Sequence, residues 1–288
     1  MTTFSNLPRR RFLQASLLGS AAIAGGVAPS PAIGAVTKPE RDPFGGLKVG
    51  VASYSLRKFT LERAIDMTKQ LGVKYITLKD MHLPLASTPD ERRAARKKIE
   101  NAGLTLISGG VIFMKNNEEE IRAAFEYAKD AGMPTIVCMP ERAALDTVEK
   151  VAKEYDIRIA IHNHGPGDKN FPAPLDAWNA VKDRDSHMGV CIDAGHTVRD
   201  GKDPIEAIHT CAGRLYDFHI KDVTAANAKG ETTAMGRGVI DLVAVVKALL
   251  AVKYAHHVAL EYEADAENPL PGMAESFAYL RGILAAIG

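Results

Sequence analysis

Residues 158–165 read RIAIHNHG, an apolar, β-branched run that closes on two histidines. Three later runs have the same form: GVCIDAGH at 189–196, LYDFHIKD at 215–222 and HVALEYE at 257–263. Each has the pattern of a buried strand that ends in histidine, aspartate or glutamate, and the spacing between runs leaves room for a loop and a helix. The repetition predicts four neighbouring parallel strands with their polar residues at one end of a sheet.

Four more strand-like runs occur upstream, at residues 48–55, 74–79, 105–111 and 135–140. The segments between them carry helix signals, such as a cap-like Thr60 with Gly72 as the stop, and an acidic start at Glu118 with Gly132 as the stop. Eight strand and helix units predict a single (β/α)8 barrel over residues 47–288, after a lead-in at 36–46. The alternative is an open doubly wound sheet, but no predicted strand is followed by a glycine-rich phosphate-binding turn.

The N-terminal segment has the composition of a signal peptide. Residues 9–13 read RRRFL and precede an uncharged segment at 15–27, with small residues near 32–35. Twin arginines followed by Phe and Leu indicate the Tat type, although Pro8 stands where Ser or Thr is more usual. We therefore expect residues 1–35 to direct export to the periplasm, with only transient membrane contact. The alternative, an uncleaved membrane anchor, would need a longer apolar segment.

Composition limits the class of protein and its partners. The chain has 288 residues, 46% of them hydrophobic and 25% charged, which is enough for a large globular core. The formal net charge of +1 includes three signal-peptide arginines, so the mature chain would carry −2, and nothing indicates a nucleic-acid partner. Three cysteines, Cys138, Cys191 and Cys211, are an odd number for a disulfide framework and are expected to be buried free thiols.

The four strand ends together predict a metal site. If one face of each strand looks toward the barrel axis, His162, Asp193, His219 and Glu261 converge as four ligands. Two imidazoles and two carboxylates suit Mn or Zn, with Fe or Co as alternatives, better than Mg or Ca. A lone histidine on a strand is more often a hydrogen-bonded core residue, and only the set of four in register favours ligation. Nearby residues that could instead orient the ligands are His164, His196 and Asp222.

Further polar residues near the predicted strand ends are candidates for substrate contact. Within LKDMHLPL, which follows the second strand, these are Lys79 and His82. The remaining substrate candidates are His196, Arg199, Arg237 and Glu263. Glu141 is expected to be a helix-start acid. Histidines away from the strand ends are expected to be structural, namely His187, His209, His256 and His257.

The motifs LKDMHLPL, AIHNHGPGD, GVCIDAGHTVRDG, HIKD, GRGVID and LEYEAD, with PLPG after them, resemble the xylose isomerase-like TIM-barrel superfamily. The similarity extends over nearly all of the chain from Gly46 and is most specific to the Tat-exported members of the sugar phosphate isomerase/epimerase group. The resemblance implies a divalent metal held by Glu, Asp, His and Glu, at positions that match His162, Asp193, His219 and Glu261. His162 replaces the first glutamate, which removes one base of a symmetric two-base epimerisation.

These observations lead to a first functional hypothesis. The protein is expected to be a metal-dependent isomerase, epimerase or lyase that abstracts a proton next to a metal-polarised carbonyl of a sugar, keto-sugar or polyol. Glu261 is the expected proton acceptor and His164 or Lys221 the donor, with Glu263 or His196 as the second base if Glu261 is held by the metal.

Two other classes of function and the oligomeric state stay open at this stage. One class is a non-catalytic periplasmic protein that binds sugar or metal. The other is a DNA-repair nuclease resembling endonuclease IV, which would need more metal ligands and a basic surface. A homodimer is carried as a hypothesis, since the sequence does not determine the number of subunits.

Overall fold

The computed structural model describes residues 42–287. The predicted signal peptide at 1–35 and residues 36–41 of the predicted lead-in lie outside the described residues. Within the described part of the chain, no helix is long and apolar enough to cross a membrane.

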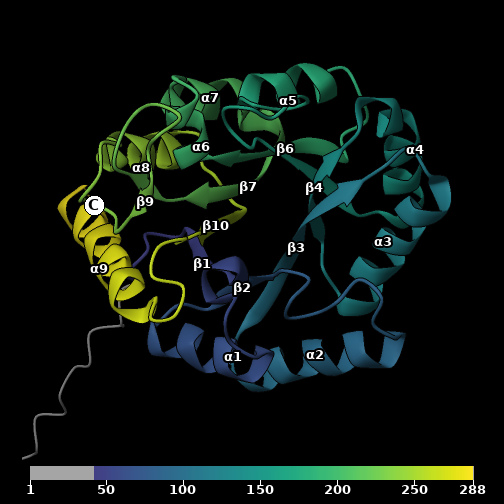
Figure 1. The fold of residues 1–288 in the computed structure, drawn as a ribbon, viewed down its shortest axis with the longest axis horizontal. Helices are drawn as coiled ribbons and strands as arrows, with labels where there is room; N and C mark the ends of the chain where they lie inside the picture. Colours follow the sequence, from purple (N-terminus) through teal and green to yellow (C-terminus); the bar gives the residue numbers. More distant parts are fainter. Residues whose placement is uncertain (1–41, 288) are drawn as a thin grey trace, which may run out of the picture. The chain divides into compact units, whose positions relative to one another are not determined.

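Eight parallel strands close into a barrel in the order β1-β10-β7-β6-β5-β4-β3-β2 (Figure 1). The predicted (β/α)8 barrel is therefore confirmed. Two further short strands, β8 (Asp222–Val223) and β9 (Thr232–Thr233), form an antiparallel pair outside the barrel. The barrel strands are β1 (Lys48–Ala52), β2 (Tyr75–Leu78), β3 (Thr105–Met114), β4 (Thr135–Pro140), β5 (Arg158–His162), β6 (Met188–Asp193), β7 (Leu215–Ile220) and β10 (His257–Leu260).

Helices surround the barrel, and local sequence sets where they begin and end. Thr60 caps the first helix by accepting a hydrogen bond from the Arg63 amide, and Gly132 ends the third with a left-handed φ of 69°. The helices are α1 (Leu61–Gln70), α2 (Pro89–Asn101), α3 (Glu118–Ala131), α4 (Leu145–Tyr155), α5 (Pro174–Val181), α6 (Ala194–Arg199), α7 (Pro204–Cys211), α8 (Leu242–Ala251) and α9 (Leu270–Ile287), with short 3-10 turns η1 (Ser53–Leu56), η2 (Arg142–Ala144) and η3 (Ala212–Arg214).

The barrel strands separate an outer hydrophobic core, which they share with the helices, from a smaller cluster inside the barrel. Their outward side chains, such as Ile136 and Ile161, join the helices in one large hydrophobic core. A smaller inner cluster fills the barrel and consists of Val137, Ala160, Cys191 and Tyr216, with Val111 packed against it. All three cysteines are free and buried, as expected. Because the inner cluster fills the barrel, a ligand could bind only at an end of the barrel and not inside it.

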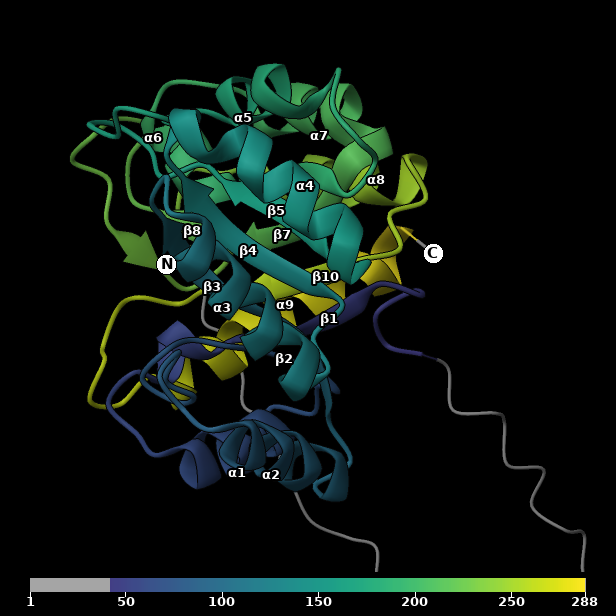
Figure 2. The same ribbon diagram turned by 90° about the vertical axis from the view of Figure 1, so that its right-hand side faces the viewer.

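Most strands end earlier than the sequence pattern predicted. The first predicted strand, 48–55, ends at Ala52 because Ser53–Leu56 form a 3-10 turn, and the sixth ends at Asp193 because that residue caps α6. His164, Lys221 and Glu263 therefore lie on the segments that follow the strands, and His196 lies in α6. In the side view of Figure 2, the arrows of β4 and β5 run toward the end of the barrel where α6 and β8 lie. That end is the candidate active-site face.

Candidate metal centre and active site

The four predicted metal-ligand residues converge at this end of the barrel. They come from β5, β6, β7 and the residue after β10, which are consecutive strands around the barrel. One donor atom from each of His162, Asp193, His219 and Glu261 lies within 4.8 Å of the others, and all four residues are buried. The convergence on which the sequence prediction depended is present. Two buried carboxylates at this spacing are expected only where a cation or a proton balances their charge.

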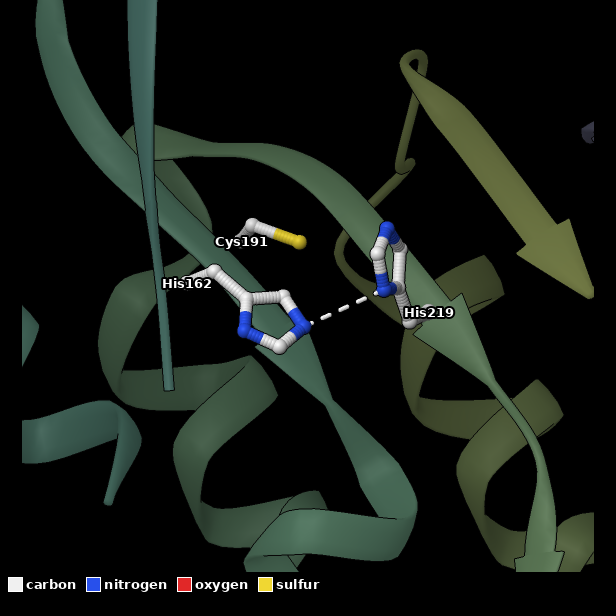
Figure 3. Close-up of side chains that lie close together, drawn as sticks. All are labelled: His162, Cys191 and His219. Carbon is white, nitrogen blue, oxygen red and sulfur yellow. Dashed lines mark hydrogen bonds between the residues drawn. The ribbon is translucent and has the colours of Figure 1, made fainter. Parts of the chain in front are cut away.

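The two histidines face each other across the centre. His162 Nε2 lies 3.2 Å from His219 Nδ1, and Figure 3 shows the two rings with these nitrogens directed at one another. Burial is the main cause that lowers the pKa of His162 to about 4. Burial also opposes protonation of His219, but the carboxylates of Glu261 and Asp193 raise its pKa well above its usual value. In the metal-free site, protonated His219 therefore donates to neutral His162, and an ion could replace that proton.

Asp193 directs one oxygen at the two imidazoles. Its Oδ1 accepts a hydrogen bond from the His196 amide at 2.7 Å and caps α6. Its Oδ2 is buried, 3.5 Å from His162 Nε2 and 3.7 Å from His219 Nδ1, and its closest charged partner is the Lys221 ammonium. A buried carboxylate oxygen beside two imidazole nitrogens fits a divalent transition metal of the kind that takes mixed nitrogen and oxygen ligands.

Lys221 brings a buried ammonium into the same group. Its Nζ lies 2.9 Å from Asp193 Oδ2, 2.7 Å from Glu261 Oε2 and 2.6 Å from Glu263 Oε1. Burial favours the neutral amine, but these carboxylates raise the pKa of Lys221 well above its usual value. Conversely, burial would raise the pKa of Asp193 and Glu261, and Lys221 lowers both. Three carboxylates and one ammonium leave two negative charges, which one divalent cation would balance.

Two residues that sequence reasoning missed support this arrangement. Asn163 accepts a hydrogen bond from the Asp193 amide at 2.8 Å and donates to Thr197 Oγ1 at 3.2 Å, so it fixes the start of α6. At Gly195, an added Cβ would lie 2.5 Å from the Lys221 side chain, so glycine leaves the room that Lys221 needs to reach the carboxylates. In the motif DAGH, Asp193 caps α6, Gly195 leaves space for the Lys221 side chain, and His196 lies at the mouth of the barrel.

Two further histidines lie beside the centre at the mouth. The ring centroids of His164 and His196 are 5.0 Å apart, and each is within 6 Å of the His162 ring, at 5.7 and 5.8 Å. His164 is exposed and His196 is partly buried. Arg199 approaches His196, with Nη1 to Nδ1 at 3.3 Å. The structure therefore brings His164, His196 and Arg199 next to the four candidate ligands.

Other sequence candidates contact different groups. Arg237 is exposed and pairs with Glu275 of α9 at 2.5 Å, so its prediction as a substrate clamp is not supported. Asp222 accepts hydrogen bonds from the amides of Gly236 and Gly238, both at 2.9 Å, and thus stabilises the loop after β9 instead of orienting a ligand.

His82 is buried and its Nδ1 lies 3.0 Å from Ser53 Oγ, and its proposed role in substrate binding stays a prediction. Lys79, which follows β2, is partly buried and donates to the Val111 carbonyl at 3.2 Å. Its proposed role in substrate binding stays a prediction. Glu141 accepts a hydrogen bond from the Asn116 amide at 3.0 Å, consistent with a local structural role and not with that of a base.

Cys191 lies close to the two histidines and is drawn with them in Figure 3. His162, Cys191 and His219 also form a geometrically acceptable set of donors. Burial raises the pKa of the Cys191 thiol to about 12, so it is a neutral thiol in the metal-free protein. The set with two carboxylates already carries the charge that attracts a cation, and we therefore favour it over the thiol-containing set.

Comparison with known proteins gives the class of this fold and site. The chain matches the xylose isomerase-like TIM barrel family over residues 65–283 and belongs to that family. It is 25% identical over 273 residues to an inosose dehydratase from Geobacillus kaustophilus, covering 77% of this chain and 85% of that protein.

Solved structures share the fold. The 3-keto-D-glucoside 4-epimerase from E. coli is 18% identical with a TM-score of 0.67, covering 82% of this chain and 99% of that one. A structure of the IOLI protein with a bound zinc atom is 16% identical with a TM-score of 0.71, covering 83% and 99%. The relatives thus include sugar epimerases and inosose dehydratases.

Proposed function

We propose that this protein is a divalent-metal-dependent lyase or isomerase acting on a ketone of a sugar or polyol. The observation that carries the proposal is the buried group of Asp193, Glu261 and Lys221 with two facing imidazoles. A divalent ion, held by His162, Asp193, His219 and Glu261, would polarise a carbonyl and lower the pKa of the adjacent C–H group. Mn or Zn fits the donor set best, and Fe or Co is an alternative.

The acid and base groups lie on one side of the site, which favours elimination over epimerisation. Glu261 Oε2 and Lys221 Nζ are in contact at 2.7 Å, so the proton acceptor and the proton donor share one face of the bound substrate. In our proposal Glu261 takes the proton next to the carbonyl. The neighbouring C–O bond then breaks, and its oxygen takes a proton from Lys221 and leaves as water. Transfer of the Glu261 proton to the Lys221 amine restores both groups.

Epimerisation would need a second group on the opposite face. His162 occupies that side of the site, but its Nε2 faces His219 Nδ1 at 3.2 Å and would be held by the ion. His164 and His196 are the alternative proton carriers, because both lie at the mouth near His162. The neutral ring of His196, whose pKa burial foremost lowers to about 4, could also bind a substrate hydroxyl.

The test is turnover and deuterium exchange with defined ketones. An inosose and a 3-keto-D-glucoside are incubated in deuterated buffer with protein loaded with Mn²⁺ or Zn²⁺, and the proton next to the carbonyl is followed by NMR. We expect exchange or loss of water that stops on chelation and returns with metal. D193A and H219A should lose bound metal and turnover together. Full turnover by metal-free protein contradicts the proposal, and saturable binding without exchange would favour a sugar-binding protein.

The DNA-repair alternative finds no support in the site. Among residues 42–287, the largest group of histidine, cysteine and acidic side chains that converges on one point has four members. A metal cluster of the endonuclease kind would need more ligands.

For localisation we propose the periplasm, on the basis of the RRRFL motif at residues 9–13. Cell fractionation, together with N-terminal sequencing of the exported form, tests this directly. An N-terminus before residue 9 would contradict cleavage.

A further inference from the structure

The mouth of the barrel has an apolar wall opposite its charged one. In β3, Ile112 and Met114 are buried in the outer core among the helices. Phe113 stands between them and, because side chains alternate along a strand, points to the other side, toward the barrel axis. Val111, two residues earlier, confirms this direction because it packs against the inner cluster.

Phe113 is 67% exposed, the most exposed large hydrophobic side chain among the described residues. Aromatic side chains gain much of their stabilisation from burial, so an exposed ring over a catalytic face usually marks a contact surface. On the loop after the adjacent strand β2, Met81 and Leu85 are both 42% exposed. Leu85 and Phe113 line one small cavity of about 160 Å³, and Leu78, Tyr127 and the carboxylate residue Asp80 also line it. Phe113 therefore has one exposed apolar neighbour, Leu85.

Strand register connects this apolar wall to the metal centre. Phe113 is paired with Met139 of β4. Cys138, the residue before Met139, is in the outer core, so the Met139 side chain faces inward. Cys138 is in turn paired with Ile161 of β5, so Met139 comes next to His162. Two strand spacings of about 4.8 Å each separate Phe113 from the candidate ligand His162. That span suits one sugar ring with a substituent beyond it.

We propose that Phe113, with Leu85, binds an apolar aglycone, so that the substrate is a keto-sugar glycoside with an aryl or alkyl group. This inference rests on the proposed function, because the sugar ring is placed by the metal centre. The polar half of the mouth, from β5 to β10, would take the ring oxygens and the carbonyl. On the other side, at β2 and β3, Phe113 would cover the aglycone and so lose its exposure to water, beside the Lys79 ammonium that donates to the Val111 carbonyl.

The test uses two ligands that differ only in the aglycone, methyl 3-keto-D-glucoside and phenyl 3-keto-D-glucoside. Their dissociation constants are measured by calorimetry on Mn²⁺-loaded protein. We expect the phenyl glycoside to bind about tenfold more tightly to the wild-type protein, as burial of a phenyl group predicts. F113A should reduce that preference to less than about threefold, while the affinity for the methyl glycoside and for Mn²⁺ stays unchanged.

Y279A is the matched control, because Tyr279 is an exposed aromatic residue on α9, 40% exposed, and should keep the full preference. Equal binding of both glycosides by the wild-type protein would overturn the aglycone site and leave the proposed function standing. A preference that persists in F113A would overturn it as well. Binding of neither glycoside to the metal-loaded protein would remove both the aglycone site and the proposed function.

Discussion

Lys221 Nζ lies 2.7 Å from Glu261 Oε2, and both groups are almost completely buried at the mouth of the barrel. Glu261 is also one of the four candidate metal ligands, so a built-in cation and a divalent ion would share one carboxylate. In the proposed reaction Lys221 would be the acid, and its ammonium would also compete with the metal ion for the Glu261 carboxylate. Metal affinity and catalysis should therefore respond in opposite directions when Lys221 is removed.

Replacement of Lys221 by methionine tests that relationship. K221M keeps the length and packing of the side chain but removes the ammonium next to Asp193 and Glu261. We expect kcat to fall by about 10²- to 10⁴-fold, because the proton donor is lost. The affinity for Mn²⁺ should rise by roughly tenfold, because a nearby positive charge is lost. Turnover assays and calorimetry measure the two effects separately, and K247M, at an exposed position of α8, is the control. Unchanged turnover, or weaker Mn²⁺ binding, would contradict the assignment.

Gly195 controls the position of Lys221. An added methyl at residue 195 would lie 2.5 Å from both Cγ and Cδ of Lys221, so G195A should displace the ammonium from the carboxylates. We expect kcat to fall by about 10- to 100-fold, since misplacement by about an ångström can have this effect. Bound metal, measured by elemental analysis, should be retained. A methyl added at Gly213 would have no other atom within 4 Å, which makes G213A the matched control. If G195A and G213A had the same kcat, the space that Gly195 leaves for Lys221 would not be needed for turnover.

Buried neutral histidines predict acid sensitivity. Burial is the main cause that lowers the pKa of His257 to about 3, and the pKa of both His162 and His196 to about 4, from 6.5. Below pH 6.5 the unfolded chain takes up protons that the folded chain does not, so the free energy of unfolding should fall as the pH falls from 6.5 toward 4. His219, with its raised pKa, acts in the opposite sense, and its contribution is lost as the pH rises above 6.5.

His257 is the residue for isolating this effect, because it lies on β10 away from the metal centre, with Nδ1 2.9 Å from Thr77 Oγ1. Urea unfolding of metal-free protein between pH 4.5 and 6.5 gives the slope of stability against pH. H257Q should have a slope smaller by up to one proton, whatever its absolute stability, whereas H209Q, at an exposed position, should keep the wild-type slope. Parallel slopes for H257Q and the wild-type protein would show that His257 is not buried in its neutral form.

The sequence predicted those parts of the site that depend on strand periodicity. His162, Asp193, His219 and Glu261 each end or follow a recognisable apolar run, so closing the barrel was enough to bring them together. The predicted strand limits were less accurate. The Asp193 side chain accepts a hydrogen bond from the first turn of α6, so the helix begins where the apolar pattern of the strand still continues.

Contacts that depend on three-dimensional packing could not be predicted. Nothing in HIKD shows that Lys221 reaches a carboxylate 42 residues away at Glu263, because that pairing depends on the neighbouring positions of β7 and β10. The partners of Arg237 and Asp222 could not be predicted for the same reason. Arg237 pairs with Glu275, and Asp222 accepts hydrogen bonds from loop amides.

The replacement of the first family glutamate by His162 leads to the last prediction. His162 comes from β5 and Glu261 follows β10, with β6 and β7 between them, so the two side chains reach the centre from different sides. H162E would place a second carboxylate opposite Glu261 while keeping four donors for the metal. We expect Mn²⁺ binding to be retained and the product to shift toward epimerised ketone, because a base on each face can remove and return the proton.

H162Q is the control, since it removes the imidazole without adding a base, and it should gain no epimerase activity. The added buried negative charge should also make metal-free H162E less stable than the wild-type protein, and binding of Mn²⁺ should remove this difference in stability. NMR of the products in deuterated buffer distinguishes the two reactions, because epimerisation leaves deuterium on the inverted carbon. If H162E bound Mn²⁺ and gave the same products as the wild-type protein, the identity of residue 162 would not determine the reaction.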